Sequence, residues 1–272
     1  MLDLRPAHKA LEHFHHGFID DSAHTVGRER FLAFDRKAYD KQQLAWGSAA
    51  WQMRALDEYR SQVSFSVLLA DLATLGFSFD VIGTATRIVR DEARHVEICR
   101  RLVKTLGGSD VMEGDPQFVF PPDSFTPIQR VLFRVAGTLC IGETLSVRLI
   151  SAGRKSTVDP LAHAVMSCLA ADESIHSRFG WVMLEMLWPQ TSKADRQLIL
   201  SLLPGWLKGT EKQIVAPAYM RMEREEPVTC APVSPFGGIG DRERACVFYD
   251  AMENEVIPRF EALGIKAKKA FR

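Results

Sequence analysis

Four long stretches of the chain place apolar residues three or four positions apart, the spacing typical of helices that bury one face. They cover roughly residues 41–75, 78–106, 127–153 and 160–187. Gly76, Gly107 and Gly153 follow or close the first three stretches, and glycine is common where helices end. No strand-length alternating run bounded by hairpin turns occurs in the sequence. The pattern therefore predicts an all-α protein.

The links between these stretches predict how the helices are arranged. The short links LGFS and GRKSTV favour two antiparallel helical hairpins. Residues 107–125 form a much longer link, and at about 3.3 Å per residue it can run the full length of a bundle. Ser124 or Thr126 is expected to cap the next helix, with Pro127 at its first position. A four-helix bundle with one long crossover follows.

The remaining residues are expected to add helices to this bundle within one domain, residues 1–272. Residues 1–40 predict one or two short helices, residues 41–188 form the bundle, and residues 189–272 form a helical extension. Within that extension, SKADRQLILSLL predicts a short helix. The last helix starts near Asp241 and is expected to break or kink at Pro258, because proline cannot donate a helical hydrogen bond.

Composition narrows the class of protein. Lys plus Arg and Asp plus Glu both total 34, so no net charge attracts nucleic acid or an anionic membrane. We expect no membrane span, because no apolar run approaches the ~18 residues required, and no signal-peptide core opens the sequence. The odd number of scattered cysteines suits free thiols in a cytoplasmic protein. They are Cys99, Cys140, Cys168, Cys230 and Cys246.

Two segments carry the same motif, Asp-Glu-x-x-His. It occurs as Asp91-Glu92-x-x-His95 in the second helix and as Asp172-Glu173-x-x-His176 in the fourth. Residues three apart lie on one helix face, so each motif aims a carboxylate and an imidazole at one point. A two-metal site in a four-helix bundle needs this pair from each of two helices and one Glu from each of the others. A third Glu-x-x-His, Glu12–His15, lacks the preceding Asp and is interpreted as chance.

The third helix supplies one clear candidate for the remaining ligands. Glu143 is the sole acidic residue between Asp123 and Asp159. Its helical neighbours are small or apolar, which would place its carboxylate in the core: Ala136, Leu139, Val147 and Ile150. A lone buried carboxylate is costly unless a cation compensates it. Glu143 is therefore a predicted metal ligand.

The first helix offers three acids, and we choose Glu58. It shares a helical face with the apolar residues Trp51 and Phe65. Asp71 points to the other side, and Asp57 lies about 100° away around the helix. The predicted metal ligands are Glu58, Glu92, His95, Glu143, Glu173 and His176.

These residues resemble the ferritin-like diiron carboxylate superfamily over residues 41–188. The stretch DEARH at 91–95 is similar to that of bacterial multicomponent monooxygenases and of the small subunit of class I ribonucleotide reductase. The resemblance implies a ferritin-like four-helix bundle and two iron ions, with Mn/Fe or Mn/Mn open. It also implies that Asp91 and Asp172 hydrogen-bond the ligand histidines and that Arg94 belongs to the same network.

The chain departs from relatives at three positions. Ile175 replaces the Arg of the second motif, which puts the supporting network in doubt. Cys99 stands where ribonucleotide reductase carries its radical tyrosine, which excludes a tyrosyl radical there. The p-aminobenzoate N-oxygenase family has a third histidine four residues before the second motif's Glu. Here that residue is Leu169, so a seventh ligand is not supported.

The resemblance implies an oxygen-activating diiron oxygenase or oxidase acting on a small organic substrate, with O₂ as co-substrate. Ferredoxin or a reductase would then supply electrons, and a homodimer stays open. Cys99, Val147 and Gly180 each lie one turn beyond a ligand and are small, so they are candidates for lining a substrate pocket. Alternatives left open are a non-catalytic metal-binding or oxidative-stress protein and a tRNA-hydroxylating monooxygenase, although the balanced charge gives no footprint for RNA.

Overall fold

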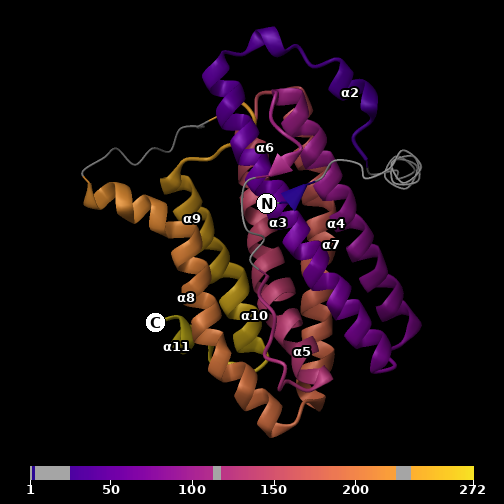
Figure 1. Cartoon of the computed structure of the whole chain (residues 1–272). Coiled ribbons are helices and arrows are strands. Elements are labelled where there is room, and N and C mark those ends of the chain that lie inside the picture. Colours follow the sequence, from indigo (N-terminus) through magenta and orange to yellow (C-terminus); the bar gives the residue numbers. More distant parts are fainter. Residues whose placement is uncertain (1, 4–24, 113–117, 225–233) are drawn as a thin grey trace.

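The computed structural model is an all-α, ferritin-like bundle, as the sequence predicts (Figure 1). It describes residues 2–3, 25–112, 118–224 and 234–272. The bundle consists of α3 (Lys41–Thr74), α4 (Phe79–Leu106), a third arm and α7 (Pro160–Leu187). The third arm runs through α5 (Pro127–Phe133), η2 (Arg134–Glu143) and α6 (Thr144–Ser156).

Local chemistry sets the helix ends close to the predicted positions. Asp40 caps α3 and exchanges side-chain hydrogen bonds with Gln43, and Thr126 caps α5 in the same way. Pro127 takes the first turn of α5, where no hydrogen bond is lost. Gly107 ends α4 in the left-handed conformation that favours glycine (φ +92°).

The crossover between α4 and α5 starts with a short strand. β2 (Val111–Met112) pairs antiparallel with β1 (Leu2–Asp3), so the beginning of the chain is tied to the crossover. The Glu12–His15 motif lies outside the described residues.

The third arm is not the continuous α-helix that the periodicity predicts. Its middle segment, η2, is a π-helix of 10 residues that ends at Glu143. A π-helix is wider than an α-helix and is rare outside functional sites. Ala136, Leu139 and Ile150 are buried as predicted, whereas Val147 is half-buried.

The extensions pack outside the bundle. At the N-terminal side lie α2 (Arg28–Leu32) and η1 (Arg36–Ala38). The predicted short helix at 192–203 is wrong in length, because α8 (Lys193–Glu223) continues through Pro204 and Pro217. The final arm comprises α9 (Asp241–Ala251), η4 (Met252–Val256), α10 (Ile257–Ala262) and α11 (Ala267–Phe271). The helix does not break at Pro258: the π-helix η4 continues directly into α10, and Pro258 lies in the first turn of α10.

The third arm, Pro127–Ser156, is long and apolar enough to cross a membrane by length and composition, and half of its most apolar window is buried inside the structure. Buried core helices of bundles pass the same test. Val131, Val135 and Leu139 are fully buried in the main apolar cluster. We therefore interpret this arm as a core helix.

Candidate metal centre

The structure brings all six predicted ligands together. They form two groups of four, and within each group the ligating atoms lie within 4.8 Å of one another. One group contains Glu58 and His95, and the other contains Glu143 and His176. Glu92 and Glu173 belong to both groups. Two overlapping groups that share two carboxylates fit a pair of bridged metal ions.

Each arm of the bundle contributes to this cluster at its centre. Glu58 comes from α3, Glu143 from the last residue of η2, and the two motifs from α4 and α7. The His95 and His176 rings face each other across the cluster, with centroids 5.8 Å apart. All six residues are buried, with at most 4% of any residue exposed.

The imidazoles present one particular nitrogen to the carboxylates. Nδ1 of His95 lies 3.4 Å from Glu58 and 3.7 Å from Glu173, but it has no hydrogen-bond partner among the described residues. Nδ1 of His176 lies 3.0 Å from oxygens of both Glu92 and Glu173. Neither carboxylate oxygen of Glu92 has a hydrogen-bond partner in the described part of the chain. Buried polar atoms normally have partners, so these atoms mark a place for a cation.

The charge of the cluster also fits metal ions. Burial and the neighbouring Glu173 charge raise the pKa of Glu92 to about 8. The same two causes raise the pKa of Glu143 well above its usual value. The protein alone cannot keep all four carboxylates ionised. Two divalent cations would balance their four charges, and the histidines among the donors favour iron over purely oxygen-binding ions such as magnesium.

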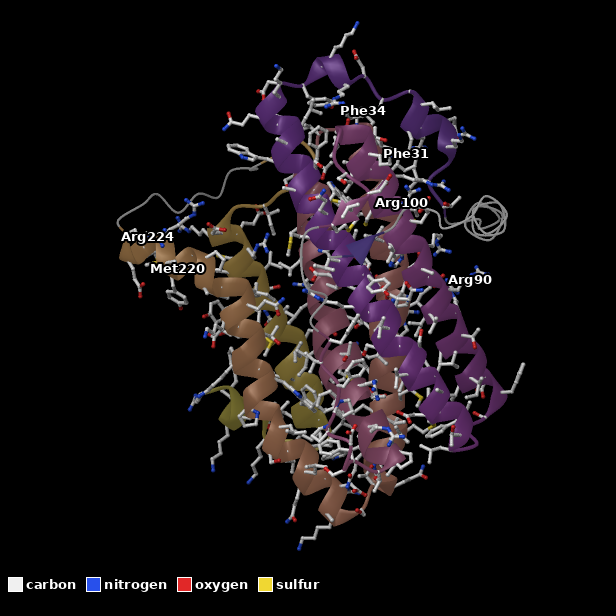
Figure 2. All side chains as sticks on the ribbon, viewed as in Figure 1. Phe31, Phe34, Arg90, Arg100, Met220 and Arg224 are labelled. Carbon is white, nitrogen blue, oxygen red and sulfur yellow. The ribbon has the colours of Figure 1, made fainter. Side chains whose placement is uncertain are left out.

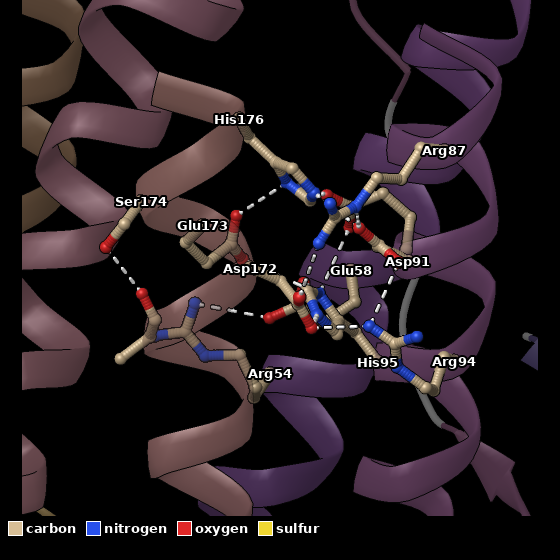
Figure 3. A network of polar contacts seen from close by, with 12 residues as sticks. Arg54, Glu58, Arg87, Asp91, Arg94, His95, Asp172, Glu173, Ser174 and His176 are labelled. Atoms are coloured by element: carbon tan, nitrogen blue, oxygen red, sulfur yellow. Dashed lines mark hydrogen bonds and ion pairs between the residues drawn. The ribbon is translucent and has the colours of Figure 1, made fainter. Parts of the chain in front are cut away.

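The two aspartates lie beside the histidines crosswise, and Asp172 makes the hydrogen bond that the family resemblance implies, whereas Asp91 makes a longer ion-pair contact. Asp172 of α7 lies 3.2 Å from Nε2 of His95 of α4, and Asp91 of α4 lies 3.5 Å from Nε2 of His176 of α7 (Figure 3). Burial opposes ionisation of Asp91, but the contacts with His176 and Arg94 lower its pKa to about 2. Each imidazole thus keeps its Nδ1 directed at the cluster.

Arginines join the two aspartates. The buried Arg94 donates through Nη2 to Asp91 at 3.0 Å and to Asp172 at 2.5 Å. Sequence reasoning missed the second arginine, Arg87, whose guanidinium lies 3.2 Å from Asp91 and 3.7 Å from Asp172. The absence of Arg at Ile175 therefore does not leave the network with a single cation. The signal was available, since Arg87 precedes Asp91 by one helical turn.

The predicted pocket role is wrong for Gly180. A Cβ atom on Gly180 would lie 2.4 Å from Leu139 Cβ and 2.9 Å from the Leu139 backbone, so α7 packs directly on η2 there. Because α4 and α7 are antiparallel, Cys99 and Gly180 lie on opposite sides of the ligand layer. Cys99 is fully buried in apolar packing, and Val147 is half-buried.

The side chain of Arg54 places a positive charge beside the predicted ligand Glu58. Arg54, one turn before Glu58 on α3, approaches its carboxylate to 3.5 Å. Burial opposes the charge of Arg54, but Glu58 and Asp57 raise its pKa overall. Asp71, the acid set aside in α3, forms ion pairs with Arg130 and Arg134. Arg54 was missed although the same signal was available, since it precedes Glu58 by one helical turn.

Comparison with known proteins identifies the family. The protein-family model described as P-aminobenzoate N-oxygenase AurF matches residues 79–227, more than half of the chain. The chain belongs to this family. No curated protein and no solved structure gives a significant match. This member is a diiron oxygenase of the ferritin-like superfamily. Leu169, four residues before Glu173, lies buried in apolar packing and offers no metal-ligating atom.

Proposed function

We propose that this chain is a monooxygenase that inserts oxygen into a small organic substrate, with an amine nitrogen as the preferred target. The two overlapping ligand groups that share Glu92 and Glu173 are the observation that carries the proposal. The family is described as an N-oxygenase, and this supports nitrogen as the target. The family match also favours an oxygenase over the non-catalytic alternative.

In this proposal each side chain has a defined role. Glu58 and His95 would hold one iron, Glu143 and His176 would hold the other, and Glu92 and Glu173 would be available to both. Two reduced irons would supply the electrons that activate O₂. The protein keeps the imidazoles oriented through Asp91 and Asp172, and its apolar core excludes water. Iron is preferred over manganese, and an external donor such as ferredoxin or a reductase supplies the electrons.

Metal loading and oxygen uptake test the proposal. Anaerobic titration of the metal-free protein with ferrous iron should saturate near two ions per chain, as the two groups require. The reduced protein should then consume O₂ faster with an arylamine present and give an oxygenated product. Saturation at one iron, or at many, would overturn the dinuclear site. Uptake that no organic substrate stimulates would favour a non-catalytic protein. The iron and manganese content of the protein as purified from cells would decide between the two metals.

A further inference from the structure

The buried indole of Trp181 connects one half of the metal centre to the outside of the bundle. Its Nε1 donates a hydrogen bond to Thr144 Oγ1 at 2.9 Å, and Thr144 directly follows the ligand Glu143 in the chain. The Thr144 hydroxyl lies 2.8 Å from the Ser177 hydroxyl, and Ser177 directly follows the ligand His176. The indole N–H therefore reaches two ligands of the same metal group, through hydrogen bonds and the chain itself.

The outer side of the Trp181 ring is covered by α10. Phe260 packs edge-on against the ring with centroids 5.0 Å apart, and the guanidinium of Arg259 lies over it, 5.2 Å from its centroid. Trp181 is 2% exposed, whereas Arg259 is exposed and lines a cavity of about 420 Å³ together with Arg148 and Glu255. An exposed cation thus lies directly over a buried ring whose N–H points toward the ligands.

Cations gather where α10 leads into α11, on the side of the bundle away from α4 (Figure 1). The Lys268 backbone N–H donates to the Glu261 carboxylate at 2.8 Å, which holds α11 against the end of α10. Residues 257–272 carry five cations and one acid. The five cations are exposed and form no ion pair within the described part of the chain: Arg259, Lys266, Lys268, Lys269 and Arg272. Such a surface attracts an acidic partner.

We propose that an acidic electron-carrier protein with an iron–sulfur centre docks on α10 and α11, and that its electrons reach the metal centre through Trp181. This rests on the proposed function and deepens it by naming where the electrons enter. In each encounter one electron passes from the iron–sulfur centre to a ferric ion at the ligands, so two encounters reduce the pair. Trp181 only bridges donor and ligands and ends each transfer unchanged. Arg259 favours the neutral, electron-rich ring and so opposes loss of an electron from it.

Binding of an oxidised carrier to the diferric protein tests the docking surface without any turnover. The probe is an acidic plant-type ferredoxin, and calorimetry at low salt measures its affinity. The double variant Lys268→Glu/Lys269→Glu should weaken binding at least about tenfold, because like charges would then face each other. Added salt should remove most of this difference, since it screens exposed charges.

The matched control also reverses two exposed cations, Lys155 in the last turn of α6 and Arg90 of α4. Arg90 lies well away from α11 (Figure 2). The double variant Lys155→Glu/Arg90→Glu has the same net charge as the first and should bind the ferredoxin as wild type does.

The rate at which the diferric protein is reduced tests the route. Trp181→Phe keeps a ring but loses the N–H that Thr144 accepts, so reduction by ferredoxin, followed by stopped-flow absorption, should lose most of its rate. Thr144→Val removes the acceptor and should slow the same step, whereas Thr144→Ser keeps the oxygen and should not. Reduced methyl viologen, a small cation that the basic surface does not attract, should reduce wild type and all three variants at equal rates.

Each part of the proposal has its own contrary result. Absence of ferredoxin binding, or an affinity that Lys268→Glu/Lys269→Glu leaves unchanged, would overturn the docking surface. Equal ferredoxin rates in wild type and Trp181→Phe would overturn the route. Equal slowing with ferredoxin and methyl viologen would overturn it too, because Trp181 would then act on the fold or on the metals themselves. Two irons and substrate-stimulated O₂ uptake with the chemical reductant would still support the proposed function in each case.

Discussion

The two halves of the metal centre have the same ligands but different surroundings. Beside Glu58 and His95, regular α-helices leave a cavity and place the cation Arg54 at the ligand. Beside Glu143 and His176, α7 packs directly on the π-helix η2 at Gly180, where a Cβ atom would lie 2.4 Å from Leu139 Cβ. The comparison teaches that a motif determines which atoms meet, whereas the packing around it determines where space remains beside the ligands.

The largest effect is expected when a metal ligand is removed, either one that belongs to a single half of the centre or one that both halves share. Glu143→Ala should lose at least one of the two metals and all oxygen activation, yet remain folded, because a buried carboxylate with raised pKa contributes little to the metal-free fold. Glu92→Ala removes a ligand that both groups share and should lose more metal. Iron analysis and melts of the metal-free variants measure this. Full loading of Glu143→Ala would show that η2 is not part of the centre.

Most of the ligand set could be predicted from the sequence because it depends on short-range geometry. The spacing within each motif places Glu and His on one face in any α-helix. Glu143 was identifiable because its arm has no other acid. The cavity beside Glu58 could not be predicted, since its lining residues Arg54 and Arg244 are 190 residues apart and meet only through the fold. Gly180 was misassigned because its spacing from His176 does not show that η2 packs directly against α7 there.

The next test removes the arginines that pair with both Asp91 and Asp172 and so connect the two halves. Arg94 is 2% exposed and pairs with both aspartates, so Arg94→Gln should destabilise the metal-free protein by about 3–5 kcal/mol, the cost of leaving buried charges unpaired. Arg87 contacts the same two aspartates but is 40% exposed, and Arg87→Gln should cost at most ~1 kcal/mol. Urea unfolding of both variants gives the difference. Equal losses would mean that Arg87 is as important to the network as Arg94.

The packed half has a direct test at Gly180. Gly180→Ala should cost about 1–3 kcal/mol, because the new methyl group would overlap Leu139 and its backbone and force η2 outward. Gly83 of α4 is the matched control, since a Cβ there meets nothing within 4 Å. Gly83→Ala should stabilise the protein by ~0.5–1 kcal/mol through helix propensity alone. If Gly180→Ala is also stabilising, the half of the centre around Glu143 and His176 is more open than its contacts indicate.

The smallest test concerns the polar contacts that brace the packed half. Thr144, next to Glu143, accepts a hydrogen bond from the Trp181 indole at 2.9 Å and lies 2.8 Å from the Ser177 hydroxyl. All three side chains are buried, and they join α6 to α7 beside the ligands. Thr144→Val preserves the shape but removes the oxygen, so it should cost about 1 kcal/mol.

Thr144→Ser is the control for this last variant. It retains the hydroxyl and loses only the methyl group, so a loss in Thr144→Val that Thr144→Ser does not show reflects the hydrogen bonds rather than packing. If the contacts of Thr144 with Trp181 and Ser177 position Glu143, Thr144→Val should also weaken binding of Co²⁺ by the ligands Glu143 and His176. Thr144→Ser should leave this binding unchanged. A stability loss in Thr144→Val without any change in metal affinity would assign these contacts to the fold rather than to metal binding. The difference between the two halves would then come from η2 and Gly180 alone. The contacts of Thr144 with Trp181 and Ser177 would hold the helices together without orienting a ligand.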